Sequence, residues 1–300
     1  MNPKRSKQPS PPFLTGSGGA HFEAHVQSAF VVLMLTGGFA PCMPSYPINK
    51  IRLQAKSAGY DTDDMVVFVE KEGGSYQRRI LCQIKHSINI TENDETFIEV
   101  IQAAWNDFNN PNNFSKGKDA IALITGPLSA TDINDVRTIL EWARQFDSED
   151  EFIEMIEKTR ISSQGKQRKL QAFKTNLQKA NGGNSLPNKS LFEFLRHFHL
   201  LGFDLDIKAG VTLSLIHSLI GQYSKEKAVS LWAQVIDEVQ FANKNAGTIT
   251  RENIGEDLRG AFTERPQKII PTEFSVIQSP QEIIGWNDWL YATDLAITNL

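Results

Sequence analysis

Residues 60–87, YDTDDMVVFVEKEGGSYQRRILCQIKHS, contain two apolar runs joined by a short segment that holds two glycines. The runs MVVFVEK and RRILCQIKHS are rich in β-branched and apolar residues, which is typical of β-strands. Gly73 and Gly74 suit the turn between them, because glycine adopts the left-handed backbone conformations that tight turns require. The stretch therefore predicts a hairpin of two antiparallel strands.

The second predicted strand carries a lysine where a strand interior is usually apolar. Side chains alternate along a strand, so Gln83 and Lys85 face the same side as Leu81, and the residues between them face the other side. Burying an ammonium group without a partner costs on the order of several kcal/mol, so Lys85 requires an anion or a wet cleft. Asp64 begins the paired strand and can supply the anion.

The flanking sequence surrounds this hairpin with helices and two further strands. Apolar residues at helical spacing predict one helix over about residues 20–35 and another over residues 94–108. INKIRLQA (48–55) and DAIALITG (119–126) predict strands before and after the hairpin, and residues 129–146 predict a further capped helix. The element order is α-β-β-β-α-β, so we expect an α/β fold with a small mixed sheet flanked by helices.

The rest of the chain predicts a different organisation. After about Asp147 the periodic segments all have helical spacing, so an all-helical second region is expected. NGGNSLPNKS (181–190) has the composition of a linker, and residues 1–17 are basic and proline-rich, which favours a disordered leader. The expected domains are thus 1–17, a folded domain over 18–180, and a helical linker or docking region over 181–300, which could lead to a further module beyond Leu300.

Composition narrows the classes of protein to consider. The chain has 300 residues, a formal net charge of −4 and an isoelectric point near 5.9, so it has no global nucleic-acid signature. Cys42 and Cys82 lie in apolar stretches without metal-ligand spacing and are interpreted as small buried residues in a reducing compartment. The apolar run AFVVLML (29–35) is too short to cross a membrane. We therefore expect a cytoplasmic protein with no membrane partner.

The polar residues of the hairpin suggest metal chemistry. Glu23 lies on the first predicted helix and adds a second carboxylate if that helix packs across the sheet. Oxygen ligands from Asp64 and Gln83 suit Mg²⁺ or Mn²⁺, and such a metal keeps open positions for water and a phosphate. The metal would stabilise charge developing on phosphorus, while Lys85 positions or activates the attacking water. Asp63 stays an alternative ligand, because the first residue of a strand is uncertain by one or two positions.

The element order, with Glu on the first helix, Asp before the second strand and Gln-x-Lys on the third, resembles the PD-(D/E)xK nuclease superfamily in its variant with Gln in place of the acid. GGAHFEAHVQSAFVVLMLTGG, GYDTDDMVVFVE, LCQIKHSI, AAWNDF and IALITGPLS are similar to the N-terminal double-stranded DNA nuclease domain of bacterial anti-phage NTPases of the STAND type. The similarity covers roughly residues 18–146.

This resemblance implies a restriction-endonuclease-like αβββαβ core and a magnesium-dependent DNA endonuclease that acts as an antiviral effector. It assigns metal binding to Asp64 and Gln83, catalysis to Lys85, and a supporting carboxylate at the catalytic site to Glu23. The expected partners are double-stranded DNA and further copies of the chain, as a dimer or tetramer formed on activation. Gln83 brings no negative charge, so an inactive nuclease-like module for nucleic-acid binding or oligomerisation is an alternative. A free-standing restriction-type nuclease is a third, although no recognition module is apparent.

A one-signed run of charges lies between Lys158 and Ser190, where the sequence contains basic residues and no acid. Four of its cations are candidates for contacts to the DNA backbone: Lys166, Arg168, Lys169 and Lys174. The alternative interpretation is a solvated helix face, and the sequence favours neither.

Overall fold

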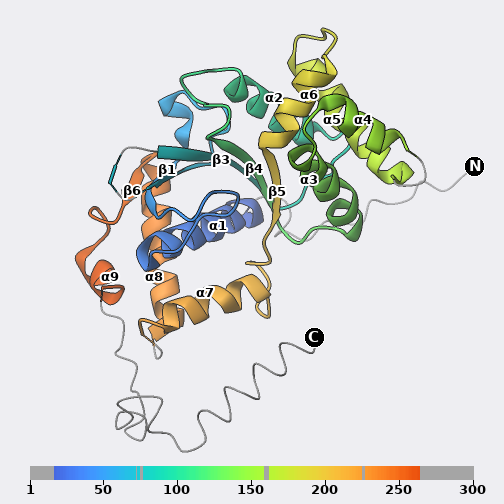
Figure 1. Ribbon diagram of the computed structural model, residues 1–300. Coiled ribbons are helices and arrows are strands. Elements are labelled where there is room, and N and C mark those ends of the chain that lie inside the picture. The colour runs from blue at the N-terminus through green and yellow to red at the C-terminus, as the bar shows by residue number, and fades with distance from the viewer. Residues whose placement is uncertain (1–16, 72, 75–76, 159–161, 225–226, 264–300) are drawn as a thin grey trace, which may run out of the picture. The chain divides into compact units, whose positions relative to one another are not determined.

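The computed structural model describes residues 17–71, 73–74, 77–158, 162–224 and 227–263 (Figure 1). The predicted leader, apart from Ser17, and the end of the predicted docking region therefore lie outside the described residues. No helix in the described part of the chain is long and apolar enough to cross a membrane.

A mixed sheet forms the centre of the fold, with the strands in the order β5-β4-β3-β2-β1-β6. The strands are β1 (Ile48–Leu53), β2 (Met65–Glu70), β3 (Gln77–Lys85), β4 (Ala120–Thr125), β5 (Phe198–Gly202) and β6 (Thr248–Thr250). β3, β4 and β5 are mutually parallel, whereas β1 pairs with both β2 and β6 in antiparallel register. This confirms the predicted α/β class with a mixed sheet.

The predicted hairpin is formed by β2 and β3. Met65 pairs with Cys82, and Gly73 and Gly74 in the turn have φ angles of 99° and 74°, in the region that favours glycine. Cys82 packs in the hydrophobic cluster on one face of the sheet and Leu81 in the cluster on the other. The alternation expected from the sequence is thus present.

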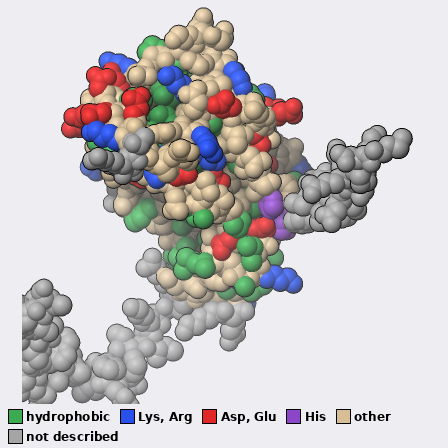
Figure 2. All heavy atoms as spheres, turned by 90° about the vertical axis from the view of Figure 1, so that its right-hand side faces the viewer, with side chains coloured by type: hydrophobic (Ala, Val, Ile, Leu, Met, Phe, Trp, Pro, Cys, Tyr) green, Lys and Arg blue, Asp and Glu red, His purple; other side chains and the backbone are tan. Residues whose placement is uncertain are grey.

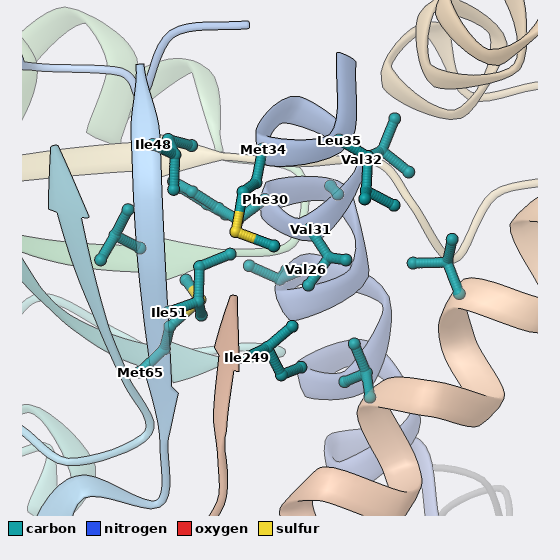
Figure 3. Packing of buried hydrophobic residues seen from close by; sticks show 14 of the residues in the cluster. Val26, Phe30, Val31, Val32, Met34, Leu35, Ile48, Ile51, Met65 and Ile249 are labelled. Atoms are coloured by element: carbon teal, nitrogen blue, oxygen red, sulfur yellow. The ribbon is translucent and has the colours of Figure 1, made fainter. Parts of the chain in front are cut away.

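One face of the sheet is covered by α1 (Ser17–Thr36), which is itself covered by α7 (Val211–Gly221) and α8 (Ala228–Lys244). Figure 3 shows Phe30 and Met34 of α1 pointing toward the strands that carry Ile48, Ile51 and Met65. A helix covered on two sides is apolar on both, which explains the unbroken run AFVVLML.

The opposite face carries the second hydrophobic cluster, built from helices α2 to α6. Their bounds are α2 (Glu95–Phe108), α3 (Thr138–Gln145), α4 (Glu149–Glu157), α5 (Gln164–Ala180) and α6 (Asn188–His197). Asp94, Ser148 and Ser163 accept hydrogen bonds from the first-turn N–H groups of α2, α4 and α5, which satisfies donors that have no partner inside a helix. The π-helical segment η3 (Asp132–Arg137) leads into α3.

The prediction of an all-helical second region is wrong in two places. HFHLL (197–201), expected to continue a helix, leaves α6 at His197 and forms β5, while β6 precedes the short helix α9 (Glu256–Ala261). A short apolar run is compatible with a helix or a strand. Here residues 198–202 form a strand because they pair with the edge of β4. Because β5 pairs with β4 in parallel register, described residues on both sides of the predicted boundary at residue 180 share one sheet.

Candidate functional site

The end of the hairpin brings Asp64 against β3. The register of β2 and β3, extended by one residue, places Asp64 opposite Gln83. The Oδ2 atom of Asp64 accepts hydrogen bonds from Gln83 Nε2 at 2.7 Å and from the backbone N–H of Ile84 at 2.6 Å. Lys85 Nζ lies 3.5 Å from the same oxygen. One carboxylate oxygen therefore faces three donors from consecutive residues of a single strand.

Lys85 has both of the features that the sequence required of a lysine in a strand. Its anion is Asp64, and its side chain is 30% exposed, against 12% for Asp64. Burial raises the pKa of the Asp64 carboxyl, and the Lys85 ammonium partly offsets that rise. The Lys85–Asp64 ion pair is long, at 3.5 Å, and an ammonium group has three donors, so Lys85 can also contact a bound anion.

Glu23 enters from α1, as the sequence predicted. Burial, reinforced by the nearby Asp64 carboxylate, raises the pKa of Glu23 to about 7. Its Oε1 atom accepts hydrogen bonds from Gln27 Nε2 at 3.0 Å and from Gln54 Nε2 at 2.7 Å. The site thus contains two carboxylates that disfavour each other's ionisation, with Lys85 as the nearby cation.

Gln27 and Gln54 belong to this cluster, and sequence reasoning missed both. Gln27 is fully buried, and its Nε2 also donates to the backbone oxygen of Asp64 at 2.9 Å. A second polar residue one turn after Glu23 on the same helix was the available signal. Gln54 follows β1 in the left-handed region with φ 46°. A non-glycine residue held there is strained, and such residues concentrate at functional sites, but nothing in the local sequence marks it.

The donor atoms of the cluster fit a hard cation. Gln83 Oε1 is buried and has no hydrogen-bond partner among the described residues, because its amide nitrogen is turned toward Asp64. Buried carbonyl oxygens nearly always have a partner, so this one needs an electropositive group. The described residues contain no group of three or more His, Cys, Asp or Glu side chains that could hold a metal, so a cation bound here would take this amide oxygen as a ligand beside Asp64.

The structure also places the alternative ligand Asp63. Its backbone oxygen accepts a hydrogen bond from Ala55 at 2.6 Å, and its side chain makes none of the contacts to Gln83, Ile84 and Lys85 that Asp64 makes. The geometry therefore favours Asp64 over Asp63 as the residue that faces β3.

The four basic candidates lie on α5, where acids from η3 meet them. Lys166 Nζ lies 3.5 Å from Asp135 and Lys169 Nζ 2.8 Å from Asp132, and both lysine side chains are mostly buried. Lys169 also donates to the backbone oxygen of Ile90 at 3.1 Å. Figure 2, which views the side carrying α3 to α6, shows acidic and basic side chains interspersed on this face. The stretch is one-signed in the sequence but not in space.

The other two candidates differ from these lysines. Arg168 is exposed and reaches Gln164 at 3.5 Å, and Lys174 is half-buried on the same helix. Contacts from Arg168 and Lys174 to a polyanion stay a prediction.

The chain as a whole matches no family model and no curated protein, but it is similar to solved structures. Solved structures of the Acinetobacter baumannii Cap4 SAVED/CARF-domain containing receptor are similar, one of them with the cyclic trinucleotide 3'3'3'-cAAA, at a TM-score of 0.44 and 14% identity. For the structure with that ligand, the match covers 81% of this chain and 44% of the receptor. The Moraxella osloensis Cap4 receptor matches with a TM-score of 0.42 and 16% identity over 79% of this chain and 45% of that one. The chain thus spans less than half the length of these receptors.

These findings contradict the predicted family and function. The similar structures are described as receptors, two of them determined with cyclic trinucleotides, and none is described as a DNA nuclease or a STAND NTPase. The predicted membership of the PD-(D/E)xK superfamily is wrong on this comparison, as is the predicted role of a double-stranded DNA endonuclease effector. The predicted partner double-stranded DNA is corrected with it, whereas assembly with further copies of the chain stays a prediction. The motif D…QxK was placed correctly in space, but a short motif does not identify the ligand.

Proposed function

We propose that this chain is a binding module for a phosphate-bearing ligand, in which Asp64 and Gln83 hold Mg²⁺ or Mn²⁺ and Lys85 contacts the phosphate. The observation that carries the proposal is the Gln83 carbonyl oxygen, which is buried beside Asp64 without a partner. Glu23 supports the site as a second carboxylate. When bound, the cation would supply positive charge for the phosphate oxygens.

A divalent cation explains the cluster better than a neutral ligand does. Burial, and after it the nearby Asp64 carboxylate, raises the pKa of Glu23 to about 7, so an ionised Glu23 raises the free energy of the site. A cation would lower that free energy and would also give the Gln83 oxygen its missing partner. Mg²⁺ and Mn²⁺ prefer oxygen ligands and keep several coordination positions open, so an anionic ligand can share the ion.

The exposed fraction of Lys85 favours a phosphate as that ligand. A lysine ammonium is a compact point charge that suits phosphate oxygens, and this one stands at the wet end of the strand. Phosphodiesters of nucleotides, such as the cyclic trinucleotides described for similar structures, belong to this class. The proposal for this chain rests on its own residues and not on that similarity.

Other predictions from the sequence concern the core fold, the reaction, the biological role and the location of the protein. The order α1-β1-β2-β3-α2-β4 supports a restriction-endonuclease-like arrangement of the core backbone. Magnesium-dependent hydrolysis stays a prediction for this site, and so do a role in antiviral defence and a cytoplasmic location.

Calorimetric titration of the chain with Mn²⁺ tests the cation site. We expect binding by the unsubstituted chain, loss of at least about tenfold in affinity for Asp64→Asn, and unchanged affinity for Asp63→Asn, which makes the same chemical change one residue away. Equal affinities for all three proteins would refute the site.

A second titration, with cyclic triadenylate in the presence of Mn²⁺, tests the phosphate ligand. Lys85→Ala should weaken triadenylate binding and leave Mn²⁺ affinity nearly unchanged. If the unsubstituted chain binds Mn²⁺ but no triadenylate, the ligand class is wrong while the cation site stands. Chromatography of the same mixtures would show whether the ligand is cleaved, which tests the hydrolase prediction directly.

A further inference from the structure

Hydrogen-bonded amide groups connect the site to α8. Asn243 of α8 donates through Nδ2 to Gln27 Oε1 at 2.6 Å, and Gln27 Nε2 donates in turn to Glu23 and to the backbone oxygen of Asp64. Asn243 is 216 residues from Gln27 in the sequence, so the contact depends entirely on the packing of α8 against α1. Neither Asn243 nor Gln27 was among the site residues predicted from the sequence.

The direction of these hydrogen bonds fixes the orientation of the Gln27 amide. A carboxamide has one accepting end and one donating end, and turning it by 180° exchanges them. With Oε1 occupied by Asn243, Nε2 must point at Glu23 and Asp64. In the reversed orientation, the Gln27 oxygen would face the Glu23 carboxylate and the Asp64 carbonyl, which places acceptor against acceptor. Glu23 and Asp64 therefore select this orientation, and Asn243 completes it by donating to the Gln27 oxygen on the other side.

We propose that Asn243 is a positioning residue which, through Gln27, holds Glu23 in place, so that α8 controls the geometry of the cation site. This inference rests on the proposed function and deepens it. Asn243 hydrogen-bonds to Gln27 and to neither Glu23 nor Asp64, and so acts by holding the Gln27 amide.

The burial of Gln27 makes its hydrogen bonds to protein groups hard to replace. Gln27 is fully buried, so neither end of its amide can turn to water when a protein partner is lost. A displacement of α8 that breaks the 2.6 Å contact would leave the Gln27 oxygen buried without a donor, and would loosen the amide whose Nε2 donates to Glu23. Any ligand or partner that moves α8 would then alter cation affinity at a distance, as positioning groups around metal sites typically do.

A double-mutant cycle tests the inference. Mn²⁺ affinity is measured for the unsubstituted chain, Asn243→Ala, Gln27→Met and the double variant, with Asn245→Ala, at the exposed position directly after α8, as the matched control. We expect Asn243→Ala to weaken Mn²⁺ binding roughly tenfold and to have no further effect in the Gln27→Met background, while Asn245→Ala changes nothing. A loss that persists in full in the Gln27→Met background would refute transmission through Gln27.

A second measurement needs no metal and separates the two proposals. The titration midpoint of the Glu23 carboxyl is followed by carbon NMR in EDTA, in a chain labelled at its glutamates. The hydrogen bond from Gln27 lowers the pKa of Glu23, so Asn243→Ala should move that midpoint upward, and Asn245→Ala should not. An unmoved midpoint overturns the inference whatever the metal data show. If the unsubstituted chain binds no Mn²⁺ and the midpoint moves, the proposed function fails and the positioning role stands.

Discussion

Replacing Glu23 by glutamine should stabilise the protein at neutral and alkaline pH. In the folded chain the pKa of Glu23 is raised from 4.5 to about 7, chiefly by burial. A carboxyl whose folded pKa is raised gives stability that is complete below its unfolded pKa and is lost as the pH rises through its folded pKa. The window of loss therefore runs from pH 4.5 to about 7, and Glu23 is an unfavourable charge above it.

The size of the effect follows from the shift. Each unit of pKa difference corresponds to about 1.4 kcal/mol, so a rise from 4.5 to about 7 gives an upper limit of about 3 kcal/mol. Glu23 is partly exposed, and solvent screening reduces this figure, so we expect Glu23→Gln to raise the free energy of unfolding by about 1–3 kcal/mol at pH 8. Near pH 5 most of this gain should vanish, because the wild-type carboxyl is then protonated in the folded state.

Urea unfolding in EDTA at pH 5 and pH 8 measures both values. Glu99→Gln, at an exposed position on α2, is the control and should change the stability little at either pH. The reasoning is refuted if Glu23→Gln destabilises the protein at pH 8, or if its effect is the same at both pH values. Loss of Mn²⁺ affinity in Glu23→Gln would show that the Glu23 charge, although it destabilises the fold, contributes to cation binding.

Two other substitutions test neighbouring features. Gln54→Gly should remove the backbone strain at φ 46° and raise the free energy of unfolding by about 1 kcal/mol, as measured by urea unfolding. The same change should weaken Mn²⁺ binding, as measured by calorimetry, because Glu23 loses the hydrogen bond from the Gln54 amide. A lower free energy of unfolding would show that this hydrogen bond outweighs the strain. Lys169→Met should cost about 1–3 kcal/mol, because Asp132 Oδ1 and the Ile90 carbonyl lose the donor that Lys169 provides, whereas Lys174→Met should cost far less. Equal melting temperatures for the two variants would favour the solvated-face interpretation of Lys169.

The parts of the site that were predictable are local in sequence. The two-residue period of a strand and the glycine turn of the hairpin are enough to place Asp64 opposite Gln83 and Lys85 on the same side as Gln83. Glu23 was predictable because a helix that precedes a sheet usually packs on it. For these residues, local periodicity and one packing step determine position.

The parts that were missed depend on contacts between distant segments. Gln54 contacts Glu23 across 31 residues of sequence, and Asn243 contacts Gln27 across 216 residues. A local sequence pattern does not indicate contacts between such distant residues. The pairing of Lys169 with Asp132 crosses 37 residues, so a window that held no acid gave a misleading charge pattern. β5 was missed because the neighbouring strand, and not its own sequence, makes it a strand.

The late position of β6 in the chain has a consequence for the order of events during synthesis. β1 pairs with β2 on one side, but its other edge is covered by β6, and the N–H of Leu53, just before Gln54, is bonded to Gly247 at 3.0 Å. A ribosome adds roughly 5–20 residues per second, so the hairpin emerges many seconds before the segment that borders it. During that interval the nascent chain carries an open strand edge along β1. The hairpin can form early, but the site is complete when the last described strand has joined the sheet.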